Sequence, residues 1–200
     1  MAFTFFFRDL QVLELSIEHV LPYITGRSKV RIWNAGCATG METYSLAILF
    51  AENMGTFAFK NLKIQATDID ESGQFGQIIK EGIYKEESLK RIPKDLLKKY
   101  FSSINNNGIY QIDEDIQQRV SYQKHDLTSL NKIGTGFSFV LCKNVLLHLN
   151  QQQRIDVIKM FHESLAPGGF FAMEQTQKMP DELSNLFERV VMNGQLYKKI

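Results

Sequence analysis

Polar and apolar residues alternate along this chain in blocks that predict strands and helices in turn. The predicted strands are short runs rich in apolar residues: 30–33, 62–67, 120–124, 137–142, 170–173 and 195–199. The predicted helices have apolar residues three or four positions apart or begin at a capping residue: 10–21, from 41, 72–80, 151–165 and from 181. Because strands alternate with helices, we expect an α/β fold whose mostly parallel sheet, of about seven strands, is covered on both faces.

Individual residues mark the expected ends of several elements. Asp9 is the expected N-cap of the first helix, and Pro22 is expected to end it. Asn150 and Asp181 are expected to begin the last two helices. The strand at 195–199 is expected to be antiparallel to the others.

The middle of the chain predicts a small appendage within one domain. Residues 83–102 indicate two short helices divided by Pro93. The asparagine-rich turn at 105–108 predicts a small β excursion around 103–122. Since there is no repeat and no low-complexity linker, we expect a single domain over 1–200.

The segment after the first predicted strand carries the clearest chemical signal. Gly36 and Gly40 bracket a loop of small residues between the strand 30–33 and the helix that begins at Met41. Without Cβ atoms, such a turn lets backbone N–H groups approach a ligand closely. The second strand ends at Asp68, where Rossmann-type folds bind ribose hydroxyls. This order of elements predicts a nucleoside-cofactor site.

Composition disfavours several other classes of function. The 200 residues are 44% hydrophobic and 22% charged, which suits one core of ordinary size. The net charge of +1, and the acids interleaved through the basic stretch 85–99, argue against a nucleic-acid or anionic-membrane surface. Two cysteines without CxxC spacing and four histidines without ligand spacing favour a reduced protein without metal. No apolar run approaches the roughly 20 residues that span a bilayer, so we expect a soluble, cytoplasmic protein.

A series of motifs along nearly the whole chain resembles one family. They are Thr-Phe-Phe-Phe-Arg-Asp (4–9), Trp-Asn-Ala-Gly-Cys-Ala-Thr-Gly (33–40), Tyr-Ser-Leu-Ala (44–47), Ala-Thr-Asp-Ile-Asp (66–70), Cys-Lys-Asn-Val-Leu (142–146) and Leu-Ala-Pro-Gly-Gly (165–169). The chain is similar to S-adenosylmethionine-dependent methyltransferases and, more narrowly, to the CheR family, which methylates glutamates of bacterial chemotaxis receptors. The resemblance implies a Rossmann-like class I methyltransferase fold. It also implies S-adenosyl-L-methionine as cofactor, S-adenosyl-L-homocysteine as product, and the helical cytoplasmic region of a chemoreceptor as substrate.

The chain also differs from the family pattern. It begins at the Phe-Phe-Arg segment, without the N-terminal helical domain that family members usually carry. After the glycine loop, the usual pair of glutamates and proline is reduced to Met-Glu-Thr at 41–43. His148 stands where a tyrosine is common, and Glu-Gln-Thr-Gln at 174–177 replaces Gly-His-Ser-Glu. These differences concern the substrate side of the site more than the cofactor side.

The resemblance implies roles for individual residues. Glu42 is implied to bind the amino group of the cofactor, Asp68 its ribose, and Asp126 with Leu127 its adenine. The full set expected at the cofactor is Thr4, Arg8, Ala35, Gly36, Gly40, Glu42, Asp68, Asp126, Leu127, Asn144 and Val145. Arg8 is expected near the transferred methyl group, where a guanidinium can hold an acceptor carboxylate by one oxygen. Arg8 and His148 are the catalytic candidates.

Each candidate also has a plainer interpretation. Glu42 suits the first turn of a helix, where the helix dipole favours acids. Asp68 could be an N-cap, although we assign that role to Asp70. Arg8 could pair with Asp9 or another surface acid, and Cys37, which lacks a histidine partner, is expected to pack in the interior.

Three functions remain compatible with these features. Methyl-ester formation on glutamate needs no base, since a glutamate with a pKa of about 4.3 is ionised at neutral pH. Transfer to an amine, hydroxyl or thiol would make His148 the first candidate base. The third is a cofactor-binding interaction module with little turnover. A dehydrogenase is disfavoured because the loop lacks the GxGxxG spacing.

Overall fold

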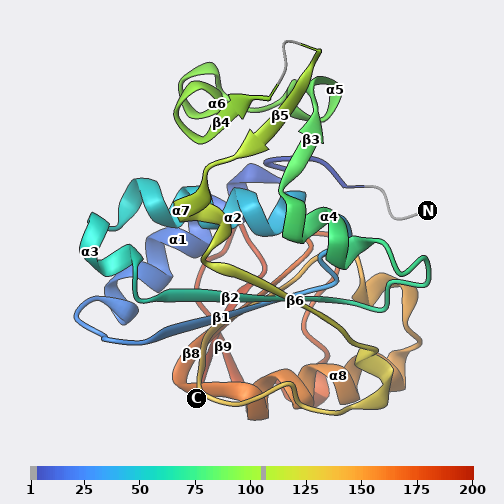
Figure 1. Cartoon of the computed structure of the whole chain (residues 1–200). Coiled ribbons are helices and arrows are strands. Elements are labelled where there is room, and N and C mark those ends of the chain that lie inside the picture. Colours follow the sequence, from blue (N-terminus) through green and yellow to red (C-terminus); the bar gives the residue numbers. More distant parts are fainter. Residues whose placement is uncertain (1–3, 105–106) are drawn as a thin grey trace.

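The computed structural model of the protein describes residues 4–104 and 107–200. Its main sheet has seven strands in the order β6-β2-β1-β7-β8-β10-β9 (Figure 1). They are β6 (Val120–Lys124), β2 (Leu62–Asp68), β1 (Val30–Ala35), β7 (Phe137–Cys142), β8 (Leu165–Met173), β10 (Leu196–Lys199) and β9 (Phe187–Arg189). β10 is antiparallel to β8 and β9, and the other pairs are parallel. The expected α/β fold with a mostly parallel sheet and an antiparallel last strand is confirmed.

Helices cover both faces of the main sheet. They are α1 (Leu10–Ile24), α2 (Met41–Asn53), α3 (Thr56–Phe59), α4 (Phe75–Glu81) and α8 (Gln151–Ser164). Figure 1 shows α1, α2 and α4 on the face opposite α8. Because side chains alternate along a strand, Ile32 of β1 packs in the core with α1 and α2, whereas Trp33 packs in the core with α8. Burial on both faces explains the continuous apolar runs of the central strands.

The start of α8 shows how local sequence fixes an element. The side chain of Asn150 accepts the N–H of Gln153 at 2.9 Å, and the side chain of Gln153 accepts the N–H of Asn150 at 3.1 Å. This complete capping box satisfies N–H groups that the helix leaves without partners. The predicted start of this helix is confirmed.

A smaller antiparallel sheet stands apart from the main one in Figure 1. Its strands and the short helices around them are β3 (Ile83–Lys85), α5 (Glu86–Leu89), α6 (Lys94–Tyr100), β4 (Phe101–Ser103), β5 (Ile109–Ile112) and α7 (Glu114–Gln117). The two short helices on either side of Pro93 are confirmed. The sheet begins before the expected excursion at 103–122 because the buried ring of Tyr84 anchors β3 against Tyr44 and Phe6. Residues 105 and 106 of the expected turn lie outside the described residues.

The expected end of the first helix is wrong, and its expected N-cap, Asp9, is right in position only. α1 continues through Pro22, since a proline there removes one N–H donor while the buried Ile24 still anchors the last turn in the core. Asp9 precedes the helix but its side chain makes no capping hydrogen bond. Its backbone has a φ of 50°, and its carboxylate lies 3.4 Å from Lys143 Nζ.

Two later helices also differ from expectation. α4 begins later than predicted, because the carboxylate of Asp70 accepts the N–H groups of Gln74 and Phe75 and so caps the helix there. The helix expected from Asp181 is wrong. Only a single 3₁₀ turn, η3 (Asp181–Leu183), forms, and the chain then enters β9, which pairs with β10 at the edge of the sheet. Pairing in the sheet outweighs the local helix signal.

Candidate functional site

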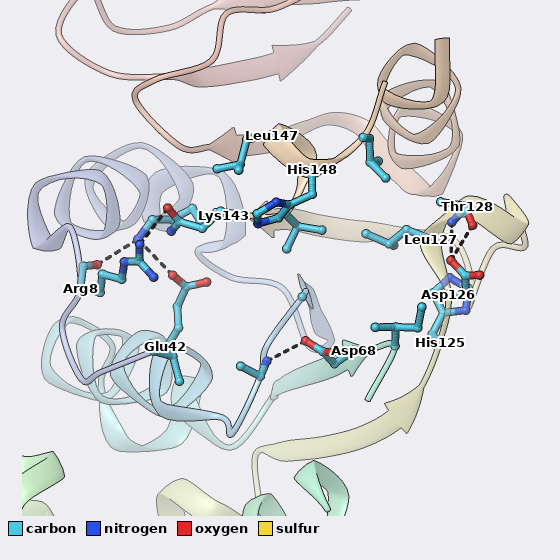
Figure 2. Close-up of a pocket in the computed structure, with 17 residues that line it drawn as sticks. Arg8, Glu42, Asp68, His125, Asp126, Leu127, Thr128, Lys143, Leu147 and His148 are labelled. Carbon is cyan, nitrogen blue, oxygen red and sulfur yellow. Dashed lines mark hydrogen bonds and ion pairs between the residues drawn. The ribbon is translucent and has the colours of Figure 1, made fainter. Parts of the chain in front are cut away.

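A pocket of about 670 Å³ opens at the carboxyl ends of β1, β2, β6 and β7 (Figure 2). Parallel α/β sheets bind ligands at this edge because the loops after their strands gather there. The volume suits a small molecule. Most of the residues predicted for the site line this pocket: Thr4, Arg8, Gly36, Glu42, Asp68, Asp126, Leu127, Asn144, Val145 and His148.

The glycine loop shapes the pocket wall through packing. Gly36 and Gly40 have φ values of +81° and +84°, which glycine adopts without strain. A Cβ on Gly36 would lie 2.1 Å from a methyl carbon of Val145, so glycine allows this pocket residue to approach the loop. A Cβ on Gly40 would instead meet Ile79 at 2.5 Å. Gly40 and the buried Ala35 lie outside the pocket lining, which differs from the expectation for these two residues.

The aspartate that ends β2, Asp68, and the one two residues later, Asp70, have different surroundings. Asp68 lines the pocket, and its carboxylate accepts the backbone N–H groups of Ala38 at 2.8 Å and of Asp70 at 3.0 Å. Asp70 is buried. Burial opposes its ionisation, but hydrogen bonds from Ser72, Tyr122 and the first N–H groups of α4 prevail and lower the pKa of Asp70. Asp70 is confirmed as the cap, and Asp68 is the acid that faces the pocket.

Glu42, in the first turn of α2, has both carboxylate oxygens held. The side chain of Asn34 donates to Oε1 at 3.1 Å, and Lys143 Nζ lies 3.0 Å from Oε2. The side chain of Lys143 is 0% exposed. Lys143 is a site residue that the sequence pattern did not reveal. The available signal was a lysine directly after a fully buried strand, since buried cations are almost always paired.

The N-terminal segment brings Arg8 to the same end of the pocket. Phe6 is fully buried, with its ring against the rings of Tyr84 and Phe101, both in the smaller sheet. The carbonyl of Arg8 accepts a hydrogen bond from Lys143 Nζ at 2.9 Å. Its guanidinium donates to Asn144 Oδ1 at 3.1 Å. The segment therefore packs on the domain, as its aromatic run predicts.

The chain turns sharply after β7. Asn144 has a φ of 59°, and its backbone N–H donates to a carboxylate oxygen of Glu174 at 3.1 Å. Burial raises the pKa of Glu174. The 3₁₀ turn η2 (Leu146–His148) follows and places His148 on the pocket wall. Glu174, from the segment that departs from the family pattern, thus holds the turn that carries Asn144 and His148.

The opposite end of the pocket is formed after β6 (Figure 2). Asp126 Oδ1 accepts the N–H of Thr128 at 2.8 Å and its hydroxyl at 2.7 Å, which closes the 3₁₀ turn η1 (Leu127–Ser129). Leu127 adds an apolar surface. Burial lowers the pKa of His125, which favours the neutral ring. Its Nε2 is buried without a hydrogen-bond partner among the described residues.

Comparison with known proteins decides the family. The sequence profile of one protein family, the CheR methyltransferase SAM-binding domain, matches residues 2–195 of this chain. The chain belongs to the CheR methyltransferase family. It is 30% identical over 190 residues to chemotaxis protein methyltransferase 2 of Vibrio cholerae, covering 92% of this chain and 64% of that protein. It is also 30% identical over 189 residues to chemotaxis protein methyltransferase 1 of Pseudomonas aeruginosa. That match covers 89% of this chain and 68% of the Pseudomonas protein.

The family match agrees with the observed architecture. The chain spans less than two thirds of the Vibrio cholerae relative, at 64% of its length. One similar solved structure is that of the glycopeptide N-methyltransferase MtfA, which is 14% identical in sequence and has a TM-score of 0.49. The match covers 86% of this chain and 56% of the MtfA chain. The expected Rossmann-like class I methyltransferase fold is confirmed by the sheet order together with the family match.

The side chains of this CheR-family pocket fit S-adenosylmethionine. The Glu42 carboxylate at one end suits the ammonium of an amino acid. Asp68, midway along the pocket in Figure 2, suits the hydroxyls of a ribose. At the other end, the oxygens of Asp126 and the surface of Leu127 suit the amine and ring of adenine. The order of the three groups matches the order of the three parts of the cofactor.

Other chemistry finds less support. Burial raises the pKa of the Cys37 thiol well above its usual value, which keeps it protonated and inert, as expected for a packed residue. Within 4–104 and 107–200, no three or more His, Cys, Asp or Glu side chains gather in a way that could hold a metal ion. None of the helices in these ranges has the length and apolar character to cross a membrane.

Proposed function

We propose that this chain transfers a methyl group from S-adenosylmethionine to glutamate side chains of a chemoreceptor-like protein and forms methyl esters. The observation that carries the proposal is one pocket in which Glu42, Asp68 and Asp126 follow one another and Arg8 lies beside Glu42. The names of the relatives, chemotaxis protein methyltransferases, support a receptor as substrate. The helical cytoplasmic region of the receptor, and a cytoplasmic location for the enzyme, are part of the proposal.

The chain's own residues hold and orient the cofactor. Glu42 would bind its ammonium, Asp68 its ribose hydroxyls, and Asp126 with Leu127 its adenine. Thr4, Gly36, Asn144 and Val145 complete the wall. When bound, S-adenosylmethionine would supply a methyl group from its sulfonium to a carboxylate oxygen of the acceptor. The oxygen donates the electron pair of the new O–C bond while the C–S bond breaks, which leaves a neutral thioether and a neutral ester.

Arg8 is the residue proposed to hold the acceptor. Its planar guanidinium can bind one oxygen of a glutamate carboxylate and leave the other free to attack. Its carbonyl is fixed by Lys143 and its guanidinium donates to Asn144, so its position is set from two sides. A glutamate with a pKa of about 4.3 is ionised at neutral pH. The enzyme then has only to align acceptor, methyl and sulfur, and it needs no base.

One observation favours a second candidate function. His148, on the pocket wall, stands where the family commonly has tyrosine, and it could serve as a base for an amine, hydroxyl or thiol acceptor. The family match and the names of the relatives favour glutamate as acceptor over this alternative and over a binding module without turnover.

A labelling experiment separates these functions. The full chain would be incubated with methyl-labelled S-adenosylmethionine and a receptor cytoplasmic fragment, and the labelled protein would be treated with mild base. Methyl esters release labelled methanol, whereas methylated amines keep their label. We expect base-labile label on the receptor. Base-stable label would support the second acceptor class, and no label would contradict methyl transfer altogether.

A further inference from the structure

Lys143 is a buried cation that the proposed reaction does not use. It directly follows β7, and its side chain is 0% exposed. It lines the inner end of the pocket beside Glu42 and Arg8 (Figure 2). A buried ammonium is costly unless it is paired, so its place at the pocket calls for a reason.

The ammonium of Lys143 has one hydrogen bond and two ion pairs within the protein. Lys143 Nζ donates to the carbonyl of Arg8 at 2.9 Å and lies 3.0 Å from Glu42 Oε2 and 3.4 Å from Asp9 Oδ2. A lysine ammonium has three donors and no acceptor. These contacts tie Lys143 to Arg8, Glu42 and Asp9, so it can influence a ligand through the groups that it holds.

We propose that Lys143 is a positioning residue for the amino-acid end of the cofactor. This inference rests on the proposed function, in which Glu42 binds the cofactor ammonium. Lys143 fixes Oε2 of Glu42 while Asn34 fixes Oε1 at 3.1 Å, so the carboxylate is oriented before the ligand arrives. By binding the Arg8 carbonyl, Lys143 also fastens the N-terminal segment over the same end of the pocket.

The charges explain why a cation is suited to this place. Glu42 is buried, and without a counter-ion its carboxylate would lie in the interior with a single neutral partner, Asn34. With Lys143 present the pair is neutral as a whole, and each carboxylate oxygen still has acceptor capacity beyond the bond that holds it. Because the groups are already oriented, binding does not have to order them.

The test compares two nucleosides that differ at one end. S-adenosylhomocysteine has the amino-acid end, and 5′-methylthioadenosine lacks it while keeping the ribose and adenine. In Lys143→Met, calorimetry should show S-adenosylhomocysteine binding weakened about ten- to a hundredfold. Binding of 5′-methylthioadenosine should stay within about twofold, because Asp68 and Asp126 do not contact Lys143.

A matched control separates this effect from the loss of an ordinary ion pair. Lys132 Nζ lies 2.9 Å from Glu163 Oε2, and both side chains are largely exposed and outside the pocket lining. Lys132→Met should leave the affinity for both nucleosides unchanged. Equal weakening of both nucleosides in Lys143→Met, or no weakening of either, would overturn the inference.

A second variant, Glu42→Gln, keeps the test decisive if Lys143→Met alone does not fold. In Glu42→Gln the ion pair between Lys143 and Glu42 is already lost, and adding Lys143→Met should cause no further loss of S-adenosylhomocysteine binding that depends on this pair. A further loss of tenfold or so in the double variant would show that Lys143 does not act through Glu42. If the wild type binds neither nucleoside, the proposed function fails with the inference; if it binds both but Lys143→Met behaves as wild type, the inference alone fails.

Discussion

At the scale of the residue, the acids of the site differ in what holds them. Glu42 meets a buried cation and an amide, Asp68 meets two backbone N–H groups, and Asp126 meets the N–H and hydroxyl of Thr128. The carboxylate of the buried Asp70 accepts two backbone N–H groups at the start of α4 and two side-chain hydroxyls, so its acceptor capacity is used within the protein. The carboxylates that also face the pocket are therefore the ones suited to a ligand.

Replacement of Asp68 by alanine should weaken nucleoside binding. The variant loses a carboxylate proposed to accept from the ribose, so affinity for S-adenosylhomocysteine and for 5′-methylthioadenosine should fall alike, by about ten- to a hundredfold. Titration calorimetry measures both. Asp113→Ala is the matched control, since Asp113 accepts a backbone N–H of Asp115 at 2.9 Å outside the pocket lining. Unchanged affinity in Asp68→Ala would assign Asp68 to holding the loop alone.

At the scale of the element, the sequence predicts those helix and strand ends that are decided by residues close together in the chain. The capping box at Asn150 and the capping of α4 by Asp70 were readable because their partners lie within a few residues. Lys143 was not, since its partner Arg8 is 135 positions away. The helix expected from Asp181 failed for a different reason, because pairing of β9 with the nearby strand β10 outweighs the local helix signal.

The glycine loop offers a test of packing. Gly36→Ala should destabilise the protein by the cost of a left-handed alanine, about 1–2 kcal/mol, plus about 1–3 kcal/mol for the clash with Val145. Gly26→Ala separates the two contributions, because Gly26 has a similar φ of +79° and no atom within 4 Å of a built Cβ. Urea unfolding of both variants measures the difference. Equal losses in the two variants would contradict the tight contact between Gly36 and Val145.

The cap of α4 should be sensitive to acid. The pKa of Asp70 is lowered in the folded state, so its ionisation stabilises the fold above the unfolded pKa, about 3.9. That stability is lost as the pH falls through the lower folded value. Asp70→Asn removes the charged acceptor, so the gap in thermal stability between wild type and variant should be constant near neutrality and shrink below about pH 4. A gap that persists in acid would argue against an ionised cap.

At the scale of the whole molecule, the main sheet gathers distant segments at one edge. The central position of β1 and β7, predictable from their apolar runs, places the loops after both strands at the pocket. The position of the N-terminal segment depends on contacts to the smaller sheet and to Lys143, which no local pattern encodes. Arg8 and His148 thus come from distant parts of the chain to one pocket, and the proposed acceptor would lie between them.

The most direct test of a carboxylate acceptor is the single-turnover rate of methyl transfer to a receptor fragment as a function of pH. If Arg8 positions an ionised glutamate, the wild-type rate should be flat from about pH 6 to pH 8.5, since the acceptor is already charged there. Arg8→Ala should abolish transfer while S-adenosylhomocysteine affinity stays within a few-fold, and His148→Tyr should keep the rate. A wild-type rate that rises through pH ~6.5 and is lost in His148→Tyr would contradict the account.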